Sequence, residues 1–540
     1  MAEIKHSEKP VTSSAVVRNY AAVILVLLSA FSLSSQDDPA KMQNRKKIEL
    51  VYADEDIVIR EEETDIDVHH IIGNVKFRMD ESTLTCDSAH WLPDKMQVTA
   101  FSRAHIEQGD TLDLYGNYMF YDGKIDIADV MGDVELIDKE THLYTSAIKY
   151  DVKNQIANYD KRGRITNGDK TLTSIIGVYY VNQNLFHFKD SVKVVNPDYV
   201  MTSDTMNYNT ATETVHFTGP SEVKGDSIYM YCERGWYDTK SKNSAIWRNA
   251  LIDNFKNRLR GDSLFYNDST GFGEGYRNVI IDDTASNVFI QGNYALYNKY
   301  PEKYFMTDRA VFVQVTNDDS LFLHADTLTA ITVKKDSLTD FKLVKAYYKC
   351  RIFSKDIQAM CDSLTFSFQD TVIKLYDNPV IWSEQNQLTA DSMSLFTKNQ
   401  QTDKLELYNA SFVTSRIDTV RFNQIKGDNL TAYFKDDEVY KIDIKGNGES
   451  IYYLIDGEEL AGLNKSKSAN IQILINEGQV TDVIEEQNPT GIIDPPQQLN
   501  PKEPKLEGFR WLDMYRPRKK EDIFRKTEKP VVIKDRNTKN

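Results

Sequence analysis

The sequence has little of the residues that mark several protein classes. It contains four cysteines and 14 prolines in 540 residues. So few cysteines exclude a disulfide-rich scaffold, and so few prolines exclude collagen-like and mucin-like chains. Positive charge is also in deficit, because 65 Lys and Arg stand against 81 Asp and Glu, for a net charge of −16. A chain this acidic is a poor candidate for binding nucleic acid through phosphate contacts.

Recognisable catalytic motifs are missing as well. The chain has no HExxH, no GxSxG and no GxxxxGK[ST]. His69 and His70 have no further ligand at metal-binding spacing, which indicates a surface pair. The sequence therefore predicts a protein that is not an enzyme, with no catalytic residue, no metal site and no cofactor.

The N-terminus has the order of a secretory signal peptide. Basic residues precede an apolar run at residues 21–33, and two serines follow it. This run of 13 residues is shorter than the roughly 20 that a membrane-spanning helix needs. We therefore expect export, with an uncleaved membrane anchor as the alternative. No cysteine follows the run, so a lipoprotein anchor is not supported.

The four cysteines leave one pairing open. Cys350 and Cys361 are 11 positions apart and could form a disulfide if they reach facing strands. The alternative is that these two residues, together with Cys86 and Cys232, are buried free thiols.

A repeat runs along the chain. Each copy holds a residue, polar in all copies but one and here called the marker, which is followed four positions later by an aromatic residue and then often by Asp or Asn. The markers are Asp87, Asn117, Ser146, Ile175, Asp204, Glu233, Asp262 and Asn293, with looser copies at Asp326, Asp362, Asp391 and Asp428. The first eight are spaced by 29 to 31 residues. Such regular spacing predicts a stack of repeats.

The spacing within each copy is that of a β-strand. The aromatics are Trp91, Tyr121, Tyr150, Tyr179, Tyr208, Tyr237, Tyr266 and Tyr297. An apolar residue stands two positions past most markers, so marker, apolar residue and aromatic are expected on one face. A second strand precedes each marker, and long helical patterns are missing. The sequence therefore predicts an all-β chain of stacked two-strand repeats.

This shared face supplies the candidate binding surface. Its residues are Met119, Tyr121, Ile148, Tyr150, Met206, Tyr208, Leu264 and Tyr266. Stacking places them in one continuous row. The row is either a closed core or the wall of an open groove for apolar chains, and the alternation alone does not distinguish the two.

The acidic markers allow another interpretation. Glycosidases use paired carboxylates, and the acidic markers of the later copies could line one face. They are Asp204, Asp262, Asp362, Asp391 and Asp428. A catalytic pair must converge at one point, whereas these residues are spread along the array, so a structural position is the simpler interpretation.

Three segments resemble the OstA-like family: residues 116–136, 201–223 and 425–449. The resemblance covers roughly residues 47–484 and rests on the residue pattern of the repeats. The family includes the periplasmic bridge protein of lipopolysaccharide transport in Gram-negative bacteria and the N-terminal domain of its outer-membrane partner. It implies an elongated antiparallel β-jellyroll with an open V-shaped groove that shields lipid A acyl chains. The chain differs from the simplest bridge proteins in its greater length.

The resemblance also implies partners and a location. The ligand would be lipopolysaccharide or lipid A, held without catalysis, in the periplasm or at the outer membrane. Other lipopolysaccharide-transport proteins would pair with open strand edges, which we expect around residues 57–60 and 470–475. An outer-membrane β-barrel component and a carbohydrate-active β-solenoid remain alternatives.

The expected organisation has five parts. They are a signal peptide at 1–35, a linker at 36–47, regular repeats at 48–340, degenerate repeats at 341–486 and a Pro-rich tail at 487–540. Residues 501–540 hold 13 Lys and Arg but 7 Asp and Glu, so the end of the tail is basic. We expect this tail to be mostly disordered, with one anchoring patch at residues 509–511 and Tyr515.

Overall fold

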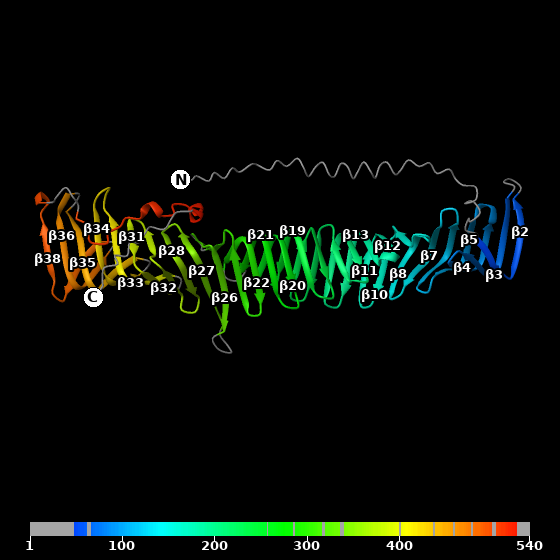
Figure 1. The fold of residues 1–540 in the computed structure, drawn as a ribbon, viewed down its shortest axis with the longest axis horizontal. Helices are drawn as coiled ribbons and strands as arrows, with labels where there is room; N and C mark the ends of the chain where they lie inside the picture. The colour runs from blue at the N-terminus through cyan, green and yellow to red at the C-terminus, as the bar shows by residue number, and fades with distance from the viewer. Residues whose placement is uncertain are drawn as a thin grey trace, which may run out of the picture.

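The chain forms a long array of strands that lie across its long axis (Figure 1). The computed structural model describes residues 48–525, apart from 62–65, 256, 284–286, 316–318, 335–339, 399–400, 436–437, 457–458, 477–478 and 499–503. The described residues form 38 strands in one sheet, and every strand pairing is antiparallel. The predicted all-β class is confirmed. The expected signal peptide and linker lie outside the described residues.

The strands follow one another with short turns. The first are β1 Ile48–Tyr52, β2 Glu55–Glu61, β3 Ile66–Met79, β4 Ser82–Leu92, β5 Gln97–Gln108, β6 Leu112–Asp122, β7 Ile127–Asp138, β8 Thr141–Asp151, β9 Ile156–Tyr159, β10 Gly163–Asn167, β11 Lys170–Ser174, β12 Ile176–Tyr180 and β13 Leu185–Asn196. The central ones are β14 Tyr199–Asn209, β15 Thr214–Phe217, β16 Ser221–Gly225, β17 Tyr229–Cys232, β18 Arg234–Asp238, β19 Asn243–Asp253, β20 Asn257–Asn267, β21 Phe272–Asp283, β22 Val288–Lys299, β23 Glu302–Thr307, β24 Val311–Val315, β25 Ser320–His324 and β26 Thr327–Lys334. The last are β27 Asp340–Phe353, β28 Ile357–Ser367, β29 Val372–Tyr376, β30 Val380–Ser383, β31 Asn386–Thr389, β32 Ser392–Lys398, β33 Gln401–Arg416, β34 Phe422–Lys435, β35 Glu438–Asp456, β36 Glu459–Asn476, β37 Gln479–Glu486 and β38 Thr490–Asp494. Short 3₁₀ helices are η2 Pro93–Lys95, η3 Val181–Gln183, η4 Pro496–Gln498, η5 Asp513–Tyr515 and η6 Lys520–Phe524.

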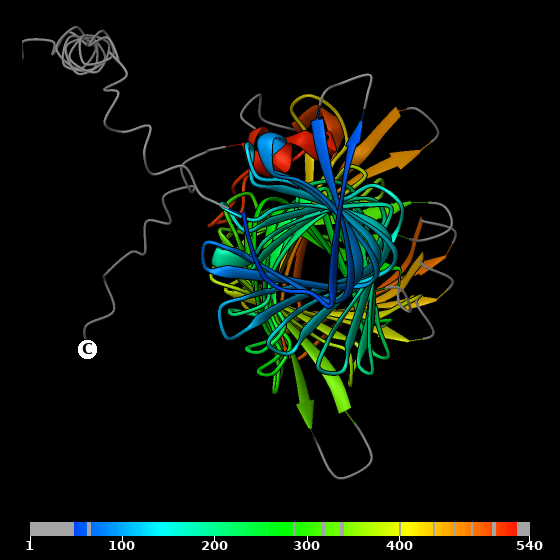
Figure 2. The ribbon, with the colours of Figure 1, turned by 90° about the vertical axis from the view of Figure 1, so that its right-hand side faces the viewer.

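The long strands are bent near their middle by β-bulges. In β6, Leu114 and Met119 are both buried although they are five positions apart, and the marker Asn117 between them is exposed. In the neighbouring strand β7, the residues opposite are Gly132 and Asp133, whose φ values are 76° and 47°. An extra residue in one strand of a pair bends that strand. The sheet is thereby folded along its length into two facing half-sheets, which Figure 2 shows in the view along the array.

The bulge corrects one expectation about the markers. Marker, apolar residue and aromatic were expected on one face, but the bulge shifts the alternation by one residue, so the markers lie outside. There Asp262 accepts a hydrogen bond at 3.2 Å from Asn278, a bulge residue with a φ of 51°. Equivalent bonds join Asp87 to Arg103, Glu233 to Asn249 and Asp428 to Asn447. The side chains of these four markers therefore stabilise the bends.

Residues 504–525, which we call the strap, run back over the outer face of the last part of the array (Figure 1). Leu512, 9% exposed, packs in a cluster with the fully buried Trp382. Ile523 packs in a second cluster with Val313. Both clusters are separate from the interior core, because they use the residues of the strands that point outward.

Buried glutamines hold the backbone of the strap. Gln387, 1% exposed, accepts a hydrogen bond from the Leu512 amide at 2.6 Å and donates one to the Arg510 carbonyl at 2.7 Å. The ring of Phe509, within the predicted anchoring patch, lies 5.3 Å from that of Phe422. The described part of the tail is thus more extensively packed than the sequence suggested, because apolar residues spread along the strap each meet an outward-facing apolar cluster.

The two ends of the array present different strand edges. Among the described residues, β2 pairs with β3 alone and is exposed along its whole length. At the other end, Ile473 in β36 faces Ile442 in β35 and Val483 in β37, and is 4% exposed. The expectation that residues 470–475 form an edge is therefore wrong, because β37 pairs with them.

Candidate functional site

The eight candidate residues lie in the interior, between the two half-sheets. All of them are between 0 and 5% exposed. Met206 shows the arrangement, since it faces Phe188 on one neighbouring strand and Phe217 on the other. The eight belong to a single apolar cluster whose buried members run from Ile48 to Ile473. The structure thus brings the predicted row together along the array.

The opposite wall of this interior was missed by reading the sequence. It is built by an apolar residue three positions before each marker, on the other side of the bend. These residues are Leu84, Leu114, Leu143, Leu172, Met201, Met230, Leu259 and Ile290, all 9% exposed or less. The sequence does contain this row of apolar residues. Because they stand an odd number of positions from the marker, simple strand alternation places them on the opposite face, and only a bulge brings them inside.

The half-sheets end at two rows of hairpin turns that lie opposite each other. We call the line between these rows the mouth. Turns 139–140 and 168–169 belong to one row, and turns 152–155 and 210–213 belong to the other. Side chains cross from row to row, and each crossing joins residues 41 to 59 positions apart. The crossings join Gln108 to Tyr150 and Val152, Asp138 to Tyr179, Lys170 to Glu213, Asn257 to Glu302, and Asp283 to Lys342.

The hydroxyls of the aromatic row take part in closing the mouth. Tyr150 donates to Gln108 Oε1 at 2.5 Å, and Tyr179 donates to Asp138 Oδ2 at 2.5 Å. Burial, together with the nearby Asp138 carboxylate, raises the pKa of both phenols above their usual range. Both tyrosines therefore stay neutral donors, with the ring in the apolar interior and the hydroxyl at its polar border.

One crossing is an ion pair in which only the lysine is largely buried. The side chain of Lys170 is 10% exposed, and that of its partner Glu213 is 37% exposed. Burial acts to lower the pKa of Lys170, but the Glu213 carboxylate and nearby tyrosines outweigh it, so the pKa is raised. The hydrogen bond from Lys170 lowers the pKa of Glu213. Burial raises the pKa of the adjacent Tyr208, although the ammonium of Lys170 opposes that shift.

A cavity lies in the mouth at the N-terminal end. It has a volume of about 520 Å³, and its lining includes Ile48, Met79, Gln108, Tyr121 and Val152. The site therefore combines apolar side chains of the interior with polar groups from both rows of turns. In the central array, the cavity beside Tyr266, Tyr297 and Tyr304 has a volume of only about 20 Å³.

The other sequence candidates do not form a reactive centre. The acidic markers are distributed one per repeat along the outside of the bends. His69 Nδ1 lies 3.0 Å from Asp56 Oδ2. Within the described parts of the chain, no three His, Cys, Asp or Glu side chains are grouped so that they could bind a metal ion. Those same parts contain no helix of the length and apolarity that crossing a membrane requires.

These features define an elongated antiparallel β-array with a continuous apolar interior and a polar mouth. Residues 45–204 match the model of the family described as OstA-like protein. This match to part of the chain supports the OstA-like family that the sequence predicted. No curated protein matches the chain.

A solved structure also resembles part of the chain. It is that of LptH, the LptA-homologous periplasmic component of the lipopolysaccharide transport device from Pseudomonas aeruginosa. The sequence identity is 15%, the match covers 25% of this chain and 79% of that one, and the TM-score is 0.14.

Proposed function

We propose that this protein is a periplasmic bridge that carries lipopolysaccharide, with the acyl chains held between the two half-sheets. The observation that carries the proposal is the single apolar cluster whose buried members run from Ile48 to Ile473. Each buried CH₂ group of an acyl chain gains about 0.8 kcal/mol on leaving water. An interior repeated at constant spacing offers many similar weak sites, which suits a lipid that slides without chemical change.

The mouth supplies the route by which a lipid would enter. The cavity of about 520 Å³ beside Tyr121 is the proposed loading point, because there the apolar interior meets the polar turns. Farther along, the half-sheets are joined by side chains such as Lys170 and Glu213. Passage of a lipid would require these contacts to open in turn. The headgroup would stay outside among polar groups while the acyl chains displace side-chain contacts inside.

The ends of the array would bind other transport proteins by strand pairing. Ile57 in β2 is 46% exposed, and at the other end Val483 in β37 and Ile492 in β38 are 44% and 65% exposed. Exposed edge strands with apolar side chains favour the addition of a strand from a partner. Ile57→Lys should therefore reduce capture of partner proteins without unfolding the array, because the residue already lies in water.

Photo-crosslinking in intact cells tests lipid binding. A photoreactive amino acid at Tyr121 or Tyr208 should capture lipopolysaccharide, identified by mass spectrometry of the adduct. The matched control is Thr202, which lies in β14 with Tyr208 but is exposed on the opposite face. Folded, periplasmic protein that captures no lipid at either tyrosine, or captures it equally at Thr202, would refute the proposal.

A further inference from the structure

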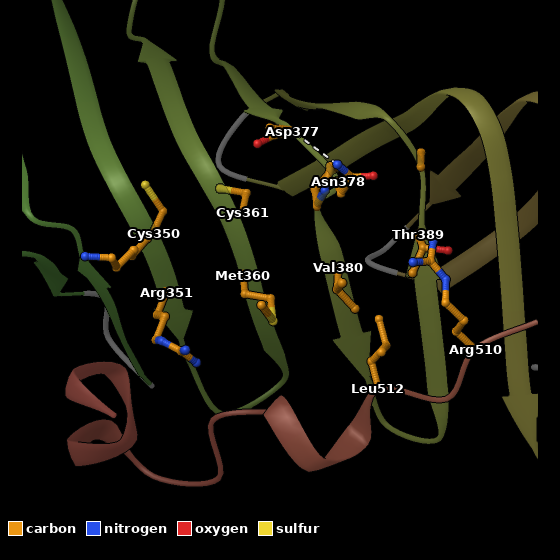
Figure 3. A pocket seen from close by; sticks show the side chains of 13 residues that line it. Cys350, Arg351, Met360, Cys361, Asp377, Asn378, Val380, Thr389, Arg510 and Leu512 are labelled. Carbon is orange, nitrogen blue, oxygen red and sulfur yellow. Dashed lines mark hydrogen bonds between the residues drawn. The ribbon is translucent and has the colours of Figure 1, made fainter. Parts of the chain in front are cut away.

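Two cysteines face each other across neighbouring strands. Cys350 in β27 is the register partner of Cys361 in β28, next to the bulge that bends this strand pair. The two are 1% and 5% exposed, and both belong to the interior cluster. Figure 3 shows their side chains next to each other on adjacent strands. The two thiols thus share one side of one strand pair.

This position satisfies the geometric demand of a disulfide. Directly facing residues of antiparallel strands have Cα atoms about 4.5 to 5.5 Å apart, and disulfides join Cα atoms about 4.4 to 6.8 Å apart. No rearrangement of the strands is needed. The other two cysteines lack such a partner, because Cys86 faces Val75 and Cys232 faces Ser221.

The strap borders the cavity beside the two thiols. This cavity has a volume of about 80 Å³, and Arg510 and Leu512 of the strap line it together with Met360 (Figure 3). A protein that exchanges disulfides cannot reach into so small a space. The neighbouring Cys350 thiol and burial both raise the pKa of Cys361 well above its usual range, so the reactive thiolate is scarce after folding.

We propose that Cys350 and Cys361 form a disulfide during export, before folding buries the two thiols. The inference rests on the proposed periplasmic location, which supplies the oxidant as the disulfide of a dithiol oxidoreductase. One cysteine thiolate attacks that disulfide and forms a mixed disulfide, and the second thiolate then displaces the carrier. Two protons leave the two cysteines, and the carrier departs reduced, as two thiols. The bond ties β27 to β28 where the marker spacing lengthens to 36 residues between Asp326 and Asp362.

Peptide mapping of the native protein tests the bond directly. The full chain is isolated from fractionated cells in the presence of an alkylating reagent, denatured, alkylated again and cleaved with trypsin without reduction. Arg351 and Lys355 lie between the two cysteines, so cleavage there separates their peptides. We expect a linked Cys350–Cys361 peptide, with Cys86 and Cys232 fully alkylated as internal controls. Periplasmic protein with all four cysteines alkylated would overturn the inference.

A second experiment distinguishes failure of the proposed disulfide from failure of the proposed periplasmic location. If the protein is found in the cytoplasm, the proposed location fails, and the bond is judged from purified chain refolded with oxidised and reduced glutathione. A linked Cys350–Cys361 peptide then supports the geometry, and its absence refutes it. In the oxidised protein, Leu512→Asp should speed reduction by dithiothreitol by about tenfold relative to the exposed control Met514→Asp, because strap opening limits access. Equal rates would refute the covering role of the strap.

Discussion

The Lys170–Glu213 pair predicts an asymmetry between the two partners when each is removed. Glu213→Gln leaves an ammonium group whose side chain is 10% exposed, whereas Lys170→Met leaves a carboxylate whose side chain is 37% exposed. Removing one partner of a buried pair costs about 3 kcal/mol because the remaining charge is uncompensated. A remaining carboxylate that reaches water costs less than about 1 kcal/mol, and Met retains the apolar stem of the lysine.

Hydrogen exchange measured by mass spectrometry is the appropriate assay, because a repeat array opens locally rather than as a unit. A loss of about 3 kcal/mol corresponds to an opening equilibrium raised about a hundredfold. We expect this loss of protection in β11 and β15 for Glu213→Gln, little change for Lys170→Met, and recovery in the double variant.

The pH dependence follows from the same burial. In the native protein the pKa of Lys170 is raised. Lys170 therefore contributes fully to the stability of the fold below its pKa in the unfolded chain, and this contribution is lost as the pH rises through its pKa in the folded protein. Without Glu213, burial dominates and lowers that pKa, so the defect of Glu213→Gln should shrink from pH 7 toward pH 10. Equal losses in both single variants, or no recovery in the double variant, would refute the asymmetry.

Three further substitutions test the fold. Ile473→Pro should destabilise the last repeats by about 3 kcal/mol, seen as a lower thermal midpoint by circular dichroism, because β36 is paired on both sides; an unchanged midpoint would contradict this. Asn278→Val should lower the midpoint more than Asn278→Gly does, because both lose the hydrogen bond to Asp262 but only a β-branched residue resists a φ of 51°; equal midpoints would show that the bulge is not under this constraint. Leu512→Asp should release the strap to limited proteolysis, whereas Met514→Asp, at a residue 74% exposed, should not; identical digestion patterns would argue against strap docking through Leu512.

Much of the fold follows from the residue pattern. Even spacing from Met206 to Tyr208 indicates a strand with one buried face, and both residues are buried. The repeat spacing predicts the stack, and the resemblance of three segments to the OstA-like family indicates the family. The role of the eight candidate residues in binding lipid stays a prediction, because alternation identifies a buried face without revealing whether a ligand can enter it. The edge predicted at residues 470–475 was misplaced, because β37 pairs with β36 there. The residue pattern identifies strands but does not show which strand is the last to pair.

The sequence by itself determined the local properties, namely strand, turn and repeat length, because side-chain alternation and turn residues act over a few positions. Only the tertiary structure decided which groups meet. The bulge turned the markers outward and brought a second apolar wall inside. The crossings of the mouth join residues 41 to 59 positions apart, and the strap reaches Gln387 and Gln358 across 123 to 158 positions. Such contacts depend on the path of the whole chain, which no local periodicity records.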